Sequence, residues 1–437
     1  MGCSFALAAD GLTKKAPRPE KGRGALLCSG AAFGIEVLRI KISCYYQSQQ
    51  FDAIQSEGKK LMLKRMRACG AVAIAACLCA CLLAFAGCSA PADTGSSEGA
   101  QDAAATKTVV DAYGRSVEVP SDVQSAATVG SGARFVVYAG GQDKLIAATE
   151  METEPALNRP YTIAYKDLFA NLPATSNGNH LLETNVNEEQ LMEFAPDVII
   201  SSRSAEECDS LQADTGIPVI GITYQNQLFT DNVYASISCV GEALGTQDHA
   251  QEVVSKLKEW DADLKARTVD IPDADKPSVY VGAVNYKGAK SFTGTYANYA
   301  PLVELGAKNV ADETGQKAAI DVDLEQIGNW DPDFMFLNAG NMDLMKADYA
   351  NNKAFFDDLK AFKEGHLYTQ PFFNFNGTNI DTGICDTYFI GATIYPDKFA
   401  DVDLDAKYSE IYTTLLGVDF YQTMKNAGMG FTTLSFS

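Results

Sequence analysis

Short apolar runs alternate with amphipathic stretches of helical length from Val109 onward. Several runs are apolar at almost every position, which is typical of strands buried on both faces of a sheet. The clearest runs, which we expect to form strands, are DVIIS at 197–201, IPVIGI at 217–222, SVYVGAV at 278–284 and DFMFL at 333–337. Because helix-length segments separate them, the pattern predicts an α/β fold with parallel sheets covered on both faces.

One long helix is predicted from Thr246. Apolar residues recur there with a period of 3.6 residues, and charged residues occupy the opposite face. The apolar positions are Ala250, Val253, Val254, Leu257, Trp260 and Leu264. About 20 residues at 1.5 Å each extend roughly 30 Å, the width of a small lobe. We expect a rigid rod that joins two lobes and permits only small hinge motion, although an ordinary packed helix would show the same stripe.

The chain contains one internal repeat. Residues 185–200 read NVNEEQLMEFAPDVII and residues 321–336 read DVDLEQIGNWDPDFMF, and the two segments agree at five of sixteen positions. Each reads as a short helix that stops before Pro-Asp and leads into an apolar strand. We therefore expect two lobes of the same α/β type. Their predicted bounds are 107–230 for the N-terminal lobe, 231–269 for an inter-lobe helical segment and 270–437 for the C-terminal lobe.

Residues 62–88 have the layout of a secretory signal. A basic cluster precedes an uncharged run rich in Ala, Leu and Cys, and small residues precede Cys88. The sequence AFAGC at 84–88 resembles a bacterial lipobox, which implies that Cys88 is lipidated and becomes the mature N-terminus. An uncleaved membrane anchor is the alternative, because about 20 apolar residues can span a bilayer. Either interpretation places the body outside the cytoplasm and holds it at the membrane.

Two further segments flank this signal. Residues 1–61 show no sustained periodicity, and a signal normally begins its chain, so we expect an upstream extension that is disordered or not translated. The true start would then be Met62 or Met66. Residues 89–106 are rich in Ser, Ala, Gly and Asp and hold no large apolar residue, which predicts a flexible linker between lipid and domain.

Charge is unevenly distributed along the chain. Residues 1–88 hold 12 of the 35 Lys and Arg and 5 of the 56 Asp and Glu, so the remainder holds 23 basic and 51 acidic residues. A body this acidic repels phosphate backbones and anionic lipid surfaces. We therefore expect no nucleic-acid partner and no electrostatic attachment to lipid headgroups.

Cysteine and histidine usage argues against a resident metal site. The body keeps only Cys208, Cys239 and Cys385, which allow at most one disulfide, and no C-x-x-C pair is present. Three widely spaced histidines do not form a zinc or copper site. We expect no metal bound directly by side chains, and the sequence leaves open whether a disulfide forms.

These features in this order resemble the ABC-transporter substrate-binding proteins that capture iron complexes and cobalamin. The likeness covers about residues 107–425, from TVVDAYGRSVEVP through NEEQLMEFAPDVIIS to LEQIGNWDPDFMFL. It implies two Rossmann-like α/β lobes joined by a single long backbone helix, with the ligand cleft between the lobes. It also implies a monomeric lipoprotein on the extracytoplasmic face of a bacterial membrane, with no cofactor and no enzymatic activity. Such a protein captures a ferric siderophore, haem or cobalamin and delivers it to an ABC permease dimer with its ATPase subunits.

The resemblance gives a role to the two glutamates in the repeat. In the family, a Glu on each lobe, seven residues before the Pro of the Pro-Asp turn, docks against Arg on the two permease subunits. Glu189 and Glu325 occupy these positions. Carboxylates placed symmetrically on two lobes would orient the loaded protein over the pore. A solvated helix glutamate is the alternative for each.

The ligand cleft is expected where loops at the carboxyl ends of strands gather. Those loops are rich in aromatic and amide residues, which suit a bulky planar or macrocyclic chelate containing iron or cobalt. Packing inside a lobe is the alternative for each aromatic residue. The candidates are Arg134, Tyr161, Tyr165, Arg203 and Tyr224 on the first lobe, and Asn285, Tyr286, Tyr296, Tyr299, Asn338, Phe372, Phe373 and Asn374 on the second.

Two other functional classes stay open. A lipid-anchored receptor or sensor would bind the same ligands without a permease, but it would have no need of matched docking carboxylates. A secreted α/β enzyme is the less favoured alternative, because Gly130 and Gly132 match only part of a dinucleotide fingerprint and Phe135 stands where a third small residue is needed. The sequence does not identify the ligand, its metal or affinity, or the neighbouring permease.

Overall fold

The computed structural model describes residues 105–176, 186–285, 288–375 and 377–436. The upstream extension, the signal with Cys88 and most of the linker lie outside the described residues, as does Tyr286. The described part of the chain opens with an antiparallel hairpin of β1 (Thr106–Val110) and β2 (Ser116–Pro120).

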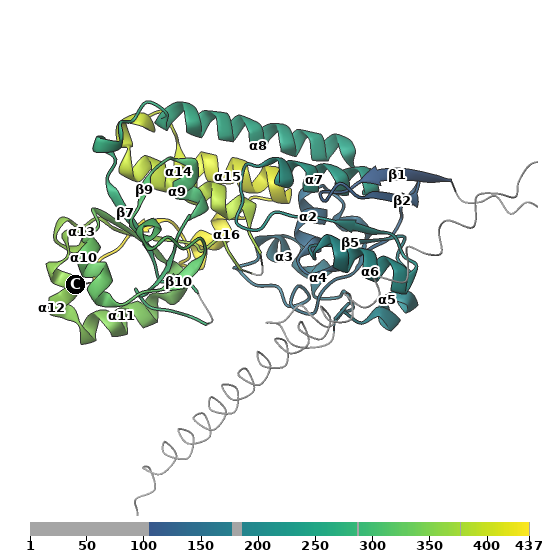
Figure 1. The fold of residues 1–437 in the computed structure, drawn as a ribbon, viewed down its shortest axis with the longest axis horizontal. Coiled ribbons are helices and arrows are strands. Elements are labelled where there is room, and N and C mark those ends of the chain that lie inside the picture. The colour runs from purple at the N-terminus through teal and green to yellow at the C-terminus, as the bar shows by residue number, and fades with distance from the viewer. Residues whose placement is uncertain (1–104, 177–185, 286–287, 376, 437) are drawn as a thin grey trace, which may run out of the picture. The chain divides into compact units, whose positions relative to one another are not determined.

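The first lobe is built around a four-stranded parallel sheet in the order β4-β3-β5-β6 (Figure 1). Its strands are β3 (Ala126–Val129), β4 (Leu145–Ala147), β5 (Val198–Ser201) and β6 (Val219–Gly221). Its helices are α2 (Gly132–Tyr138), α3 (Pro160–Ala164), α4 (Lys166–Phe169), α5 (Glu188–Phe194) and α6 (Ala205–Thr215). Gly132 lets α2 start directly on β5, because a Cβ there would collide with the carbonyl oxygen of Ile200. This close packing accounts for one glycine of the partial dinucleotide fingerprint.

The second lobe is built around a five-stranded sheet in the order β13-β12-β11-β7-β9, in which only β13 runs antiparallel to its neighbour. Its strands are β7 (Ser278–Gly282), β9 (Lys308–Asn309), β11 (Phe334–Asn338), β12 (Leu367–Gln370) and β13 (Thr432–Thr433). A separate antiparallel pair consists of β8 (Gly294–Tyr296) and β10 (Ala319–Asp321). The helices are α9 (Ala300–Glu304), α10 (Leu324–Trp330), α11 (Met342–Asn351), α12 (Lys353–Asp358), α13 (Lys360–Glu364), α14 (Ile380–Ile394), α15 (Leu404–Leu416) and α16 (Tyr421–Asn426).

Two consecutive helices connect the sheets in sequence, α7 (Asp231–Leu244) and α8 (Gln247–Thr268). The 22-residue α8 is the long helix that the apolar stripe predicts, and all six residues of that stripe are buried. It packs against α7 and also contacts α9 and α15 of the second lobe (Figure 1). The predicted α/β fold of two lobes joined by a long helix is confirmed.

Strands buried on both faces connect three apolar clusters. Val198 and Ile200 of β5 face the main cluster, whereas Ile199 faces a smaller cluster that covers the other side of the first sheet. In β11, Phe336 faces the same main cluster and Met335 faces a third cluster on the far side of the second sheet. This alternation follows from the two-residue period of a strand. One continuous core therefore extends through both lobes.

The sequence repeat corresponds to a repeated hydrogen-bonded bracket. In the first lobe, the Asp197 carboxylate accepts from the backbone N–H of Ser125, and Ser125 Oγ accepts from the N–H of Asp197. In the second lobe, Asp333 and Ser278 make the same reciprocal pair, at 2.7 and 3.0 Å. Each bracket ties the start of one strand to the start of its parallel neighbour. The Asp of each Pro-Asp turn therefore sets the register of a central strand pair.

Candidate functional site

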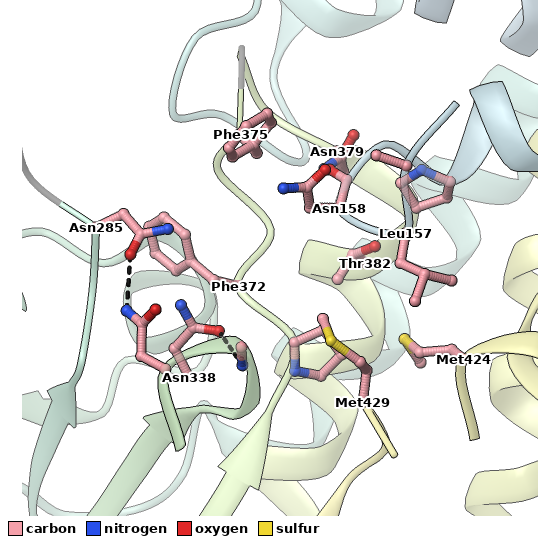
Figure 2. Close-up of a pocket in the computed structure, with 15 residues that line it drawn as sticks. Leu157, Asn158, Asn285, Asn338, Phe372, Phe375, Asn379, Thr382, Met424 and Met429 are labelled. Atoms are coloured by element: carbon pink, nitrogen blue, oxygen red, sulfur yellow. Dashed lines mark hydrogen bonds between the residues drawn. The ribbon is translucent and has the colours of Figure 1, made fainter. Parts of the chain in front are cut away.

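A pocket of about 280 Å³ lies where turns of the second lobe meet a loop of the first (Figure 2). The first lobe contributes the loop after β4, from Ala156 to Pro160. The second lobe contributes turns that follow β7, β11 and β12, the start of α14, and two methionines near the C-terminus. The lining residues are Ala156, Leu157, Asn158, Pro160, Asn285, Asn338, Gly340, Asn341, Pro371, Phe372, Phe375, Asn379, Thr382, Met424 and Met429.

Residues at or just after the ends of three parallel strands form one wall of the pocket. β7, β11 and β12 are neighbours in one sheet and point the same way, so their carboxyl ends open onto one edge. Asn285 follows β7, Asn338 ends β11 and Phe372 follows β12. The pocket thus lies at the carboxyl edge of an open α/β sheet, the expected location of a ligand site.

Hydrogen bonds fix the orientation of this amide wall. Asn341 Nδ2 donates to the carbonyl oxygen of Ala283 and to Asn285 Oδ1, both at 2.7 Å. Asn338 Oδ1 accepts from the backbone N–H of Gly340 at 3.0 Å. The oxygens of Asn285 and Asn338 are engaged in these bonds, and among the described residues no acceptor takes their Nδ2 groups. Both Nδ2 groups are therefore candidate donors to a ligand (Figure 2).

Asn379 connects the pocket to both lobes. Its Nδ2 donates to the carbonyl oxygen of Asn158 at 2.9 Å, and its Oδ1 accepts from Arg134 Nε at 3.1 Å. Both partners belong to the first lobe, whereas Asn379 caps the start of α14 in the second. Asn158 Oδ1 is buried without a hydrogen-bond partner among the described residues. The wall formed by Asn158 and Asn379 is therefore fixed on its outer side and offers an unused acceptor.

Arg134 lies behind this wall and is fully buried. Its Nη1 donates to Tyr224 Oη at 2.6 Å and its Nη2 donates to the carbonyl oxygen of Phe375 at 3.2 Å. The guanidinium also lies 4.9 Å from the ring centre of Tyr161, within cation–π range. Arg134 therefore holds the wall in place from outside the pocket.

The sequence candidates fall into several groups. Asn285, Asn338 and Phe372 line the pocket, and Arg134, Tyr161 and Tyr224 form the buried cluster behind it. A second buried aromatic cluster joins Tyr299 to Tyr296 and Phe373, with ring centres 6.1 and 5.2 Å apart. Three others lie elsewhere: Asn374 donates to Asn226, Tyr165 is half-buried, and Arg203 lines a separate small cavity beside α6. Tyr286 is outside the described residues.

Twelve of the fifteen lining residues are not among the sequence candidates. Asn341 follows Asn338 in the same turn, and Asn379 ends the loop that contains Phe372, so both could have been found by examining the loops that follow strands. Asn158 lies in the long loop that follows β4. Met424 lies in α16 and Met429 follows this helix rather than a strand, and no sequence signal points to either.

Buried carboxyls flank the pocket at the lobe junction. Tyr138 Oη on α2 donates to Asp381 Oδ2 on α14 at 2.8 Å, which links the lobes beside Asn379. Tyr161 Oη donates to Glu152 Oε1 at 2.9 Å. Burial raises the pKa of Asp381 and of Glu152, and their tyrosine donors counteract that shift. These groups build the walls of the pocket and do not line it.

A third buried carboxyl, Asp386, lies farther along α14. It accepts from Tyr299 Oη at 3.1 Å, and Tyr299 in turn accepts from Gln370 Nε2 at 2.8 Å. Burial raises the pKa of Asp386 well above its ordinary range. This chain connects α14 to the end of β12, close to Phe372.

The described residues contain no group of three or more His, Cys, Asp or Glu placed to hold a metal ion. Cys208, Cys239 and Cys385 are buried free thiols.

The two glutamates of the repeat occupy equivalent places. Glu189 lies in the first turn of α5 and Glu325 in the first turn of α10, where the helix dipole favours a negative charge. Both side chains are exposed, and neither forms an ion pair within the described part of the chain. Each helix is capped by a side chain, Asn187 or Asp323, and ends in a left-handed residue before Pro-Asp.

A family model described as periplasmic binding protein matches residues 144–372, more than half of the chain. The chain belongs to this family. The family comprises solute-binding proteins rather than enzymes, and its ABC-transporter members work with permeases and ATPases. Family membership and the lipoprotein relative described below indicate a location outside the cytoplasm. Within the described residues, none of the helices combines the length and hydrophobicity needed to span a bilayer.

Individual relatives agree with this assignment. The chain is 24% identical over 332 residues to the uncharacterized ABC transporter substrate-binding lipoprotein YvrC of Bacillus subtilis (strain 168), covering 72% of this chain and 95% of that protein. It is 23% identical over 182 residues to the Fe(3+)-citrate-binding protein YfmC of the same organism, covering 42% and 56%. A periplasmic solute binding protein from Veillonella parvula DSM 2008 has the same fold, with a TM-score of 0.60 at 22% identity over 74% of this chain and 97% of that one.

Proposed function

We propose that this protein captures a metal chelate outside the cytoplasm, releases it chemically unchanged, and delivers it to an ABC importer. The observation that carries the proposal is the pocket, which is built by the carboxyl edge of one sheet and a loop of the other lobe. The relative named for binding Fe(3+)-citrate supports a metal complex as cargo. The chelate brings its own ligands, since the described residues offer no metal-binding cluster.

The N-terminal segments would hold the protein at the membrane. In this proposal, the signal is cleaved before Cys88, Cys88 is lipidated as the mature N-terminus, and residues 89–106 tether a monomeric body of two lobes, 107–230 and 270–437. The lipoprotein relative supports this arrangement. The tether would let the body diffuse over the membrane surface and meet its permease.

Glu189 and Glu325 are proposed to dock the loaded protein onto the two permease subunits. Both carboxylates are exposed and form no ion pair with any described residue, so they are available to arginines of a partner. Their equivalent positions on α5 and α10 match a partner with two equivalent subunits. Charge-assisted contacts of this kind orient a complex.

The test combines transport and binding. Glu189→Arg with Glu325→Arg is expected to abolish ATP-coupled uptake in membrane vesicles that hold the permease, while the affinity for the chelate stays unchanged. Glu206→Arg with Glu313→Arg, which alters exposed glutamates of the two lobes outside α5 and α10, should leave uptake intact. A parallel loss of affinity would remove the docking assignment. Uptake that survives the first pair would also remove the docking role of Glu189 and Glu325. Absence of uptake with the wild-type protein would favour a receptor that serves no permease.

A further inference from the structure

The outer face of α5 carries an apolar side chain among carboxylates. Met192 is 46% exposed, and of the exposed large apolar residues in the described part of the chain it alone lies on α5 or α10. At about 100° per residue, Met192 lies between Glu188 and Glu189 on the helix circumference, and Glu193 follows on the same side. The buried Leu191 belongs to the core cluster beneath the helix. One apolar side chain ringed by three carboxylates therefore faces outward.

The equivalent face of α10 has a different surface. In the sequence repeat, position 192 corresponds to Gly328, and positions 188 and 193 correspond to Leu324 and Asn329. A Cβ at Gly328 would lie 3.0 Å from Phe355 Cε2, so α12 leaves little room for a side chain there. Glu325 is the one carboxylate within α10. The lobes therefore share the docking glutamate but differ at three positions around it.

The surface of α5 has the composition of an interface anchor with its rim. Methionine is enriched in the buried cores of protein interfaces, whereas carboxylates are depleted there and belong to the polar rim. Rim contacts that exclude water increase the contribution of the side chain they surround. The seven residues of α5 include no basic side chain, so its carboxylates favour a basic partner surface. This face is also continuous with Glu189, the proposed docking residue.

We infer that Met192 anchors the first lobe on the permease, and that the permease surface that meets α5 is an apolar hollow rimmed by basic side chains. Since α10 has no such anchor, the contact through Glu325 is the weaker of the two. The inference rests on the proposed function and deepens its docking site, because it names the chemistry of the partner surface and ranks the two lobes.

The experiment measures binding of the full-length protein, without cargo, to the importer that supports uptake with the wild type. The importer is held in nanodiscs, and binding is followed by biolayer interferometry. Met192→Ala should weaken binding roughly fivefold or more, mainly through faster dissociation. Met192→Leu should restore most of the affinity, because leucine keeps the apolar volume. Leu344→Ala is the matched control on α11, since Leu344 is 43% exposed, and it should bind as the wild type does.

Charge variants test the basic rim of the partner. Glu188→Gln with Glu193→Gln should slow association roughly threefold at low salt and make it less dependent on ionic strength. Asp275→Asn with Glu313→Gln removes two exposed carboxylates of the second lobe away from α10. This control pair should leave both the association rate and its salt dependence unchanged.

Single charge reversals rank the two lobes. Glu189→Arg should weaken binding more than Glu325→Arg does, because Glu189 belongs to the anchored contact. Equal losses, or a greater loss in Glu325→Arg, would overturn the inference. Each variant is first compared with the wild type by thermal unfolding, which separates a loss of binding from a loss of fold.

The outcomes distinguish this inference from the proposed function. Unchanged binding in Met192→Ala, or an equal loss in Leu344→Ala, would overturn the anchor and leave docking through the two glutamates standing. Unchanged association in the variant of Glu188 and Glu193 would overturn the basic rim. If the wild-type protein neither binds an importer nor supports uptake, the proposed function itself fails, and this inference fails with it.

Discussion

Replacement of Arg134 by methionine tests the junction between the lobes. Methionine has a similar reach but no hydrogen-bond donors, so the change removes the bonds to Tyr224 Oη, Asn379 Oδ1 and the Phe375 carbonyl oxygen. The side chain is fully buried, and water does not replace the lost donors. Each acceptor left behind is therefore without its partner.

The expected loss of stability in Arg134→Met follows from the buried hydrogen bonds that the substitution removes. A hydrogen bond to a charged group contributes about 1.5–3 kcal/mol, and Arg134 donates the three named above. Removal of the charge recovers several kcal/mol of desolvation cost, which offsets part of that loss. We expect the free energy of unfolding to fall by about 3–5 kcal/mol, the range for breaking a buried charged network.

Urea unfolding followed by circular dichroism measures this change, provided that the slope with denaturant stays constant. Arg203→Met is the matched control, because its guanidinium makes one ion pair, 3.6 Å from the half-exposed Glu207. That pair contributes less than about 1 kcal/mol. If Arg134→Met destabilises no more than the control, the buried contacts of Arg134 do not hold the lobes together.

Two further predictions concern stability. Burial, together with the nearby Asp261 carboxylate, raises the pKa of Glu304 to about 7 from 4.5, so the folded protein binds this proton more tightly than the unfolded chain does. Stability therefore falls as the pH rises from about 4.5 to about 7, and the full loss persists above pH 7. Glu304→Gln should raise the free energy of unfolding by up to about 3 kcal/mol at pH 8 and should leave it unchanged at pH 4. Glu313→Gln, at an exposed position, should leave the free energy of unfolding unchanged at both pH values. Asp197→Ala and Asp333→Ala test the reciprocal hydrogen bonds between neighbouring strands. Each variant should lower the free energy of unfolding in urea by about 2 kcal/mol. A variant as stable as the wild type would show that its aspartate does not stabilise the strand pair.

Apolar periodicity and the turn residues between elements explain how much of the fold the sequence could predict. The runs at 197–201, 217–222, 278–284 and 333–337 became β5, β6, β7 and β11, because strands buried on both faces leave an unbroken apolar signature. The repeat carried physical information as well. Its Pro-Asp positions are the sites where Asp197 and Asp333 bind the neighbouring strand.

The pocket was less accessible to sequence reasoning. Ligand sites are expected at the loops that follow parallel strands. This expectation identifies the correct edge of the second sheet, and it selected Asn285, Asn338 and Phe372. It does not say on which side of a wall a side chain lies. Arg134 and Tyr224 also follow strand ends, yet both pack behind the pocket, because the first-lobe loop at Asn158 and the start of α14 close over them.

The same contacts that shape the pocket also join the lobes. Asn379 meets Asn158 and Arg134 across the junction, Tyr138 meets Asp381 beside them, and one apolar core continues through both lobes. A wide opening of the lobes would break buried charged bonds and expose part of that core, each at a cost of several kcal/mol. The pocket is therefore largely formed before a ligand arrives, and its walls act as a fixed template. Because little ordering of the protein is left to occur on binding, affinity depends on how well the ligand's own groups complement the donors and acceptors of these walls.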